Sequence, residues 1–139
     1  MKQYVYLFAW ALMGVVGCQN RLGFDAAESP IQGQWRIVAI DHQDVIEPAT
    51  LILEFHPDNQ VSGSTGCNQV SGRYVSSGVA IHFLQLASTR RMCDAVLMDQ
   101  ERAVLGALSA VTTIRHDTQA QVYLHGSELH SLTLRRVLD

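Results

Sequence analysis

The segment CDAVLMDQERAVLGALSA at residues 93–110 differs from the strand-like sequence around it, because its apolar residues recur at helical spacing. It contains no proline and one glycine, and Asp94 is a favourable N-cap residue. One face of the segment is apolar and carries Leu97, Val104, Leu105 and Leu108. We therefore predict a helix over residues 94–110.

Short runs rich in apolar and β-branched residues lie on both sides of the predicted helix. Residues 51–56 alternate between apolar and polar side chains, as expected for a strand with one buried face. The next residues, HPDN at 56–59, suit a type I turn with proline at its second position. Similar runs occupy residues 35–40, 60–64, 72–76, 79–83, 111–115, 121–125 and 129–137. One helix among about eight short strands predicts a mainly β (α+β) fold, a strongly curved antiparallel sheet or incomplete barrel with the helix packed against it.

The size and composition fit one folded domain and exclude several classes of protein. The chain has 139 residues, of which 47% are hydrophobic and 17% are charged, with 10 glycines and 3 prolines. This composition excludes disordered, collagen-like and low-complexity chains. The net charge of −3 argues against a nucleic-acid-binding protein, which would show a clustered basic face.

Residues 1–17 have the pattern of a bacterial lipoprotein signal peptide. Lys2 supplies a basic start, and residues 4–16 are uncharged and apolar. A helix of that length rises about 20 Å, too short for the roughly 30 Å hydrocarbon core of a bilayer. The stretch VVGC at residues 15–18 resembles the lipobox, whose cysteine carries three acyl chains. We expect lipidation at Cys18; the alternatives are ordinary secretion with a free Cys18, or an uncleaved N-terminal helix.

The residues after Cys18 indicate how the chain is anchored. Gln19 stands where aspartate retains enteric-type lipoproteins at the inner membrane, so we expect the periplasmic face of the outer membrane. Residues 18–32 show no sustained periodicity and contain glycine, serine and proline. We expect them to form a lipidated flexible tether ahead of a domain at residues 33–139.

The other two cysteines, Cys67 and Cys93, form an even pair in an oxidising compartment, so we expect a disulfide between them. It would close a loop of about 27 residues and stabilise the fold by roughly 3.5 kcal/mol. The alternative is a reactive thiol at Cys93, because a helix N-terminus lowers the pKa of a nearby thiol.

Two sequence blocks resemble the META domain family, which includes HslJ-like heat-shock lipoproteins. They are SGSTGCNQVSGRY at residues 62–74 and ASTRRMCDAVLMDQERAVLGAL at residues 87–108, and Gly33-x-Trp35 matches the usual start of the domain. Two departures are Val70, where the family often has an aromatic residue, and Arg91, where it often has methionine. The resemblance implies a curved or incomplete barrel against one helix, a link to envelope stress, and no established enzymatic activity. The motif residues that it covers are Gly63, Gly66, Asn68, Gly72, Tyr74, Thr89 and Glu101.

The residue types in these blocks favour structural roles. The glycines suit positive φ angles or close approach of strands. Asn68 is expected to cap a turn by bonding to its neighbouring backbone. Glu101 lies on the apolar stripe of the predicted helix, so its carboxylate needs donors, for which Arg90 or the amides of residues 88–92 are candidates. The alternative for Glu101 is ligand binding or proton transfer.

Other chemistry has little support in the sequence, and we expect no cofactor and no metal. The six histidines lack the spacing of a zinc protease, and no Cys-x-x-Cys is present. His125 and His130 flank the last turn and are weak candidates for metal ligands. No Gly-x-Ser-x-Gly is present, and the glycines match no phosphate-binding loop. Arg90 and Arg91 are expected to be a solvated pair, with anionic lipid headgroups or acidic glycans as the alternative.

We therefore expect a non-catalytic, membrane-anchored envelope lipoprotein, a stress-related module that binds a periplasmic or outer-membrane protein or a cell-wall partner. One alternative is a carrier of an apolar ligand, because a curved sheet under one helix can leave a cavity. Another is a small periplasmic inhibitor of a cell-wall or proteolytic enzyme. An enzyme is the least favoured hypothesis.

Overall fold

The computed structural model describes residues 31–47, 50–117, 120–127 and 130–138. The expected signal peptide (residues 1–17), the lipidation site Cys18 and the expected tether up to residue 30 lie outside these residues. In the part of the chain that is described, no helix is long and apolar enough to cross a membrane.

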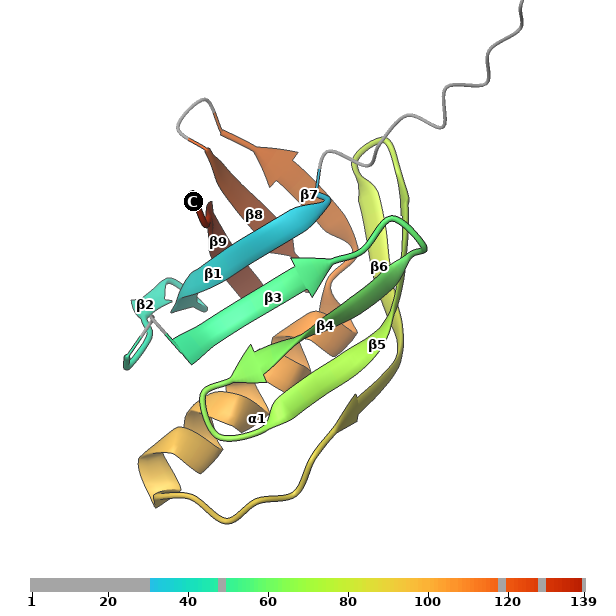
Figure 1. Ribbon diagram of the computed structural model, residues 1–139. Helices are drawn as coiled ribbons and strands as arrows, with labels where there is room; N and C mark the ends of the chain where they lie inside the picture. Colours follow the sequence, from blue (N-terminus) through green and yellow to red (C-terminus); the bar gives the residue numbers. More distant parts are fainter. Residues whose placement is uncertain (1–30, 48–49, 118–119, 128–129, 139) are drawn as a thin grey trace, which may run out of the picture.

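The described chain forms nine strands and one helix (Figure 1). In chain order they are β1 (Gly33–Ile40), β2 (Gln43–Asp44), β3 (Leu51–Phe55), β4 (Gln60–Thr65), β5 (Gln69–Ser77), β6 (Ala80–Ser88), α1 (Ala95–Ala110), β7 (Thr113–His116), β8 (Gln121–His125) and β9 (Ser131–Arg136).

The curved sheet closes into a barrel. Neighbouring strands are antiparallel in the order β1, β3, β4, β5, β6, β7, β8 and β9, and β9 pairs back onto β1 from Trp35↔Arg136 to Ile40↔Leu132. β2 is an extra strand that pairs with the end of β1. The expectation of a mainly β fold with about eight strands in a curved sheet and one packed helix is confirmed.

Pairing is weakest between β6 and β7, the strands that α1 separates in the sequence. One registered pair, Ala80↔Thr113, joins them, supported by backbone hydrogen bonds from Ile81 to Thr112 (3.1 Å) and from Ile114 to Val79 (2.8 Å). Beyond Ile81, β6 diverges from β7 toward α1. The helix lies across one end of the barrel, at the bottom of Figure 1. We call this the distal end; the opposite end, where β1 begins at Gly33, is the tether end.

Apolar side chains fill the interior of the barrel. Inward-facing residues of every barrel strand belong to one buried cluster, which α1 joins through Val104, Ala107 and Leu108. The alternation is regular: in β8, Val122 and Leu124 are fully buried between more exposed neighbours. An eight-stranded barrel is just wide enough for side chains to fill it, and this one is filled.

The turn between β3 and β4 has the expected hydrogen bond, from the Asn59 amide to the His56 carbonyl (3.2 Å). Asn59 has a φ of 62°, which closes the hairpin after the turn. Tyr74 of β5 is fully buried, and its hydroxyl donates to the His56 carbonyl (3.0 Å). Burial raises the pKa of this hydroxyl, and the negative charge of Asp58 adds to the increase. Tyr74 therefore links β5 to the turn between β3 and β4.

Two glycines show why the first motif block needs this residue type. Gly63 faces Leu53 of β3, and an added Cβ would overlap the Ile52 carbonyl oxygen and lie 2.9 Å from Leu53 Cα. Gly66, after β4, has a φ of +95°. Gly72 instead faces a bulge in β6, where an added Cβ would lie 2.9 Å from Leu86 Cδ2.

The structure differs from the expected elements in three places. β2 was missed because two residues are too few for a periodic pattern. β5 and β6 form a longer hairpin than expected, from Gln69 to Ser88. Asp94 is the N-cap of α1, but its side chain makes no capping hydrogen bond. In addition, Ile31 is fully buried and accepts a hydrogen bond from the Trp35 indole (2.6 Å), so packing extends into the expected tether.

We predict that Gly63→Ala destabilises the protein by about 3 kcal/mol, because β3 and β4 would have to separate. The control is Gly106→Ala in α1, where an added Cβ meets nothing within 4 Å. That change should stabilise the protein by up to about 1 kcal/mol, because alanine is the better helix former. Chemical denaturation measures both, and equal effects would contradict the close approach of these strands.

Candidate functional site

A disulfide fixes the segment that leads from β6 into α1. Cys67 follows β4 and Cys93 precedes α1, and the two are bonded with a Cα–Cα distance of 6.1 Å. The expected pairing is confirmed. Met98 of α1 packs against the bridge, with its sulfur 3.8 Å from the Cys67 sulfur. The β4–β5 turn, the β6–α1 loop and the first turns of α1 are thereby held together.

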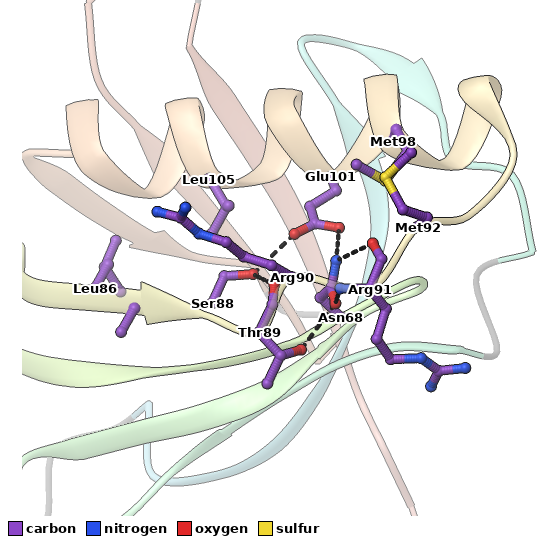
Figure 2. A pocket seen from close by; sticks show the side chains of 11 residues that line it. Asn68, Leu86, Ser88, Thr89, Arg90, Arg91, Met92, Met98, Glu101 and Leu105 are labelled. Carbon is purple, nitrogen blue, oxygen red and sulfur yellow. Dashed lines mark hydrogen bonds between the residues drawn. The ribbon is translucent and has the colours of Figure 1, made fainter.

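Glu101 lies at the centre of this junction and is only 6% exposed. Its Oε2 accepts a hydrogen bond from the Asn68 side-chain amide (2.7 Å), and its Oε1 accepts one from the Ser88 hydroxyl (2.8 Å; Figure 2). The expectation of a buried carboxylate is therefore confirmed. The expected donors were wrong, because neither the Arg90 side chain nor the amides of residues 88–92 bond to it within the described residues. Two neutral side chains satisfy the carboxylate instead.

Asn68 connects the helix to the β6–α1 loop. While its amide nitrogen donates to Glu101, its Oδ1 accepts hydrogen bonds from the Thr89 hydroxyl (2.8 Å) and the Arg91 amide (2.7 Å). Thr89 also accepts a hydrogen bond from the Gln69 amide (3.1 Å). We call Asn68, Ser88, Thr89 and Glu101 the polar network. It joins the β4–β5 turn, the end of β6, the loop and α1.

The expectation that Asn68 caps its own turn was wrong, since its side chain reaches across to the loop and the helix. Thr65 closes the turn instead, because its hydroxyl donates to the Asn68 carbonyl (3.0 Å) and accepts from the Asn68 amide (3.3 Å). Neither Thr65 nor Ser88 was anticipated from the sequence. The spacing of Thr65 three residues before Asn68 was a usable signal, because threonine hydroxyls commonly close such turns.

A hollow of about 680 Å³ lies beside the polar network, between the end of β6 and α1 (Figure 2). Leu86 and Leu105 contribute apolar surface to it, together with Met98. Three consecutive loop residues, Arg90, Arg91 and Met92, also line the hollow and are exposed, and Met92 is 92% exposed. The hollow therefore combines apolar surface, two cationic side chains and a loop whose backbone is held by Asn68.

A second polar cluster lies on the outer face of the barrel and was not anticipated. His56 Nε2 is 2.9 Å from the Ser62 hydroxyl, and His56 Nδ1 is 3.9 Å from a Glu54 carboxylate oxygen. This arrangement resembles a serine–histidine–carboxylate catalytic triad. However, Ser62 lies inside β4, where it is paired with Glu54 on one side and Ser71 on the other. The backbone amides around it belong to the sheet, which leaves no pair of donors for an oxyanion.

The remaining chemical candidates are not brought together. The part of the chain that the structure describes contains no group of three or more histidine, cysteine or acidic residues that could hold a metal. His125 stacks on Tyr123 with ring centroids 6.3 Å apart, and His130 has a buried Nδ1 without a hydrogen-bond partner. The two thiols beside α1 are used in the disulfide.

We predict that Glu101→Ala lowers the free energy of unfolding by about 3 kcal/mol, because Asn68 and Ser88 would lose the charged acceptor of their shortest hydrogen bonds and α1 would lose its link to the β4–β5 turn. Asn68→Ala should have a similar effect, and the double variant should lose less than the sum, because both changes break one bond. Thermal and chemical denaturation measure these effects.

The control for this prediction is Asp99→Ala on the exposed side of α1. Asp99 pairs with Arg102 at the surface, so its loss should change stability by less than about 1 kcal/mol. A melting curve that is unchanged in Glu101→Ala would show that the carboxylate is not structural.

Comparisons with known proteins agree with this architecture. The model of the META domain family matches residues 28–137. The fold resembles that of a Burkholderia xenovorans protein solved by NMR, with a TM-score of 0.64, 22% identity, and coverage of 78% of this chain and 83% of that chain. It also resembles a DUF4847 family protein from Bacteroides vulgatus, with a TM-score of 0.54, 11% identity, and coverage of 74% and 90%. No curated protein matches the chain. Because the family model spans most of the sequence and both of its motif blocks, the chain belongs to the META domain family.

Proposed function

We propose that this protein is a non-catalytic envelope lipoprotein, anchored through Cys18 on the periplasmic face of the outer membrane, whose META domain binds a protein partner at the hollow between β6 and α1. The observation that carries the proposal is the contrast between the polar network and the loop above it. Both oxygens of Glu101 and the oxygen of Asn68 are occupied by donors of the same chain. Met92, three residues from Thr89, is almost fully exposed.

This arrangement favours binding over catalysis. A general acid or base must have a free position for the proton that it transfers, and the buried groups of the network are engaged with one another. Exposed methionines suit adaptable apolar contacts, and arginines are enriched in protein interfaces. The network thus supports a rigid platform, and the residues that it presents are of the types that bind a protein.

The packed core disfavours the alternative of an apolar carrier. A carrier of this architecture would hold its ligand inside the barrel, where this chain places large side chains such as Phe55 and Tyr74. The hollow lies outside that cluster and is lined by charged as well as apolar residues. The inhibitor hypothesis and the link to envelope stress remain compatible with the proposed binding surface.

The binding surface is tested by placing a photoreactive amino acid at Met92 of the full chain and irradiating intact cells. The control position is Val79, which is 69% exposed at the opposite end of the β5–β6 hairpin. We expect a discrete protein adduct at Met92 that is absent at Val79 and is lost when Arg91→Glu is added. The same adducts at both positions, or adducts that persist with Arg91→Glu, would contradict a partner site at the hollow.

The anchor is tested by the intact mass of the protein from a membrane fraction, with thiol labelling before and after reduction. We expect a mass that fits triacylated Cys18, and labelling of Cys67 and Cys93 only after reduction. An unlipidated chain that carries label on Cys93 without reduction would contradict the anchor, the compartment and the disulfide together.

A further inference from the structure

Arginines gather on the outer wall formed by β7, β8, β9 and β1. The inward residues of these strands are apolar, so the alternate positions face outward. Arg115 of β7 is paired with Tyr123 of β8, and Arg135 of β9 is paired directly with Arg36 of β1. We call Arg36, Arg115 and Arg135 the basic wall. In the barrel order this wall lies across from β4 and β5.

The basic wall is not neutralised within the domain. Among the described residues, none of the three arginines forms an ion pair with a carboxylate. Like charges directly opposite on neighbouring strands are destabilising, as for Arg36 and Arg135. The Arg36 Nε is also buried without a hydrogen-bond partner. Repulsion between unpaired cations is relieved when an external anion contacts both.

Neighbouring acidic residues do not cancel this charge. Asp117 follows the last residue of β7, at one edge of the wall. Glu54 lies on β3, beyond β1, where it accepts a hydrogen bond from the Gln34 side chain (3.3 Å). Counted by formal charge, the three arginines outnumber these two flanking carboxylates, so the wall keeps a net positive charge.

The basic wall lies in the half of the barrel nearer the tether end. Arg36 is near the start of β1, and Arg115 and Arg135 are next to last in β7 and β9, which both run antiparallel to β1. Arg136 lies at the same end. Gly33, the first residue of β1, faces the Arg136 side chain, and the Arg136 amide donates to the Ala120 carbonyl (3.1 Å). Arg136 also lies over the Trp35 ring, with 5.0 Å between the guanidinium carbon and the ring centroid. The chain that leads back to Cys18 therefore enters the barrel at the end where the arginines gather.

Acidic residues gather at the opposite end. Asp41 and Asp44 flank the end of β1 and β2, and Asp99 lies on the first half of α1; all three line one surface hollow at the distal end. The separation of charge along the barrel axis is partial, because Arg90, Arg91 and Arg102 also lie at the distal end and Arg102 pairs with Asp99. In the electric field of an anionic surface, this separation orients the domain with its tether end toward the surface.

We propose that the basic wall contacts anionic phospholipid headgroups. The anchored domain then rests with its tether end on the bilayer, and the hollow between β6 and α1 is directed away from the membrane. This inference rests on the proposed lipid anchor. Guanidinium groups bind phosphate oxygens in a bidentate manner, and two directly paired arginines offer adjacent donor sets for headgroup phosphates. Once the anchor holds the domain near the surface, weak headgroup contacts are sufficient to fix its orientation.

The test uses the full-length lipidated protein, purified from membranes and reconstituted into vesicles of phosphatidylcholine, with or without phosphatidylglycerol. A fluorophore is attached to Leu138→Cys at the tether end, or to Val96→Cys at the distal end; these residues are 80% and 57% exposed. Labelling without reductant leaves the Cys67–Cys93 disulfide closed. A headgroup-linked quencher reports how close each fluorophore lies to the membrane surface.

We expect phosphatidylglycerol to increase quenching of the label at position 138 and to leave position 96 unquenched. Each arginine near an anionic surface contributes about a fivefold change in equilibrium, so replacing the basic wall by Arg36→Gln, Arg115→Gln and Arg135→Gln should lower the ratio of docked to undocked protein about 100-fold. High salt should reverse the quenching, because the contact is electrostatic.

The matched control replaces the distal arginines Arg90, Arg91 and Arg102 by glutamine, which changes the net charge equally and should preserve the quenching. Equal quenching with and without phosphatidylglycerol, or equal losses in the two triple variants, would overturn the inference. Co-flotation with pure phosphatidylcholine vesicles reports the lipid anchor alone, so failure of the anchor is distinguished from failure of the oriented contact.

Discussion

The hydrogen bond between the Asn68 amide and the Glu101 carboxylate is the contact on which the distal half of the molecule depends. The two residues are 33 positions apart, and the bond joins the β4–β5 turn to a helix that packs across the end of the barrel. A buried carboxylate without donors is strongly destabilising, so α1 can settle only where Asn68 and Ser88 meet Glu101. The disulfide and the Thr89 hydrogen bond then fix the loop that lies between them.

This constraint explains why the barrel tolerates a weak connection between β6 and β7. Strand pairing ends after Ala80↔Thr113, and the widening gap is occupied by α1, whose Val104 and Leu108 complete the core. The helix thus replaces part of a strand contact in sealing the interior. The same divergence separates the end of β6 from α1 and produces the hollow. The hollow at which we propose that a partner binds is therefore a consequence of the topology.

Much of the fold could be predicted from the sequence because its local signals agree with one another. Alternation in residues 51–56, and short apolar and β-branched runs elsewhere, identified the barrel strands. The apolar stripe identified α1 and placed Glu101 in a buried position. The partners of Glu101 were not predictable in this way. Ser88 ends a strand just before a loop, and an asparagine in a turn, such as Asn68, usually bonds to its own neighbouring backbone. Closure of the barrel was also open, because the pairing of β9 with β1 joins the two ends of the domain and leaves no local pattern. The basic wall could not be predicted for the same reason, since Arg36 and Arg135 become neighbours only when β9 pairs with β1.

The two ends of the barrel differ in whether their polar groups are satisfied within the fold, and this difference decides which residues are available for function. At the distal end, Asn68 and Glu101 satisfy one another, so their hydrogen-bonding capacity is used within the fold. Met92 and Arg90 make no comparable contribution to stability, yet the network holds their backbone in a defined position. At the tether end the reverse applies, since Arg36 and Arg135 lie directly opposite one another and the proposed contact with an outside anion relieves their repulsion. The interactions of this protein should therefore be sought at residues that contribute little to stability but are held in position by the rest of the fold.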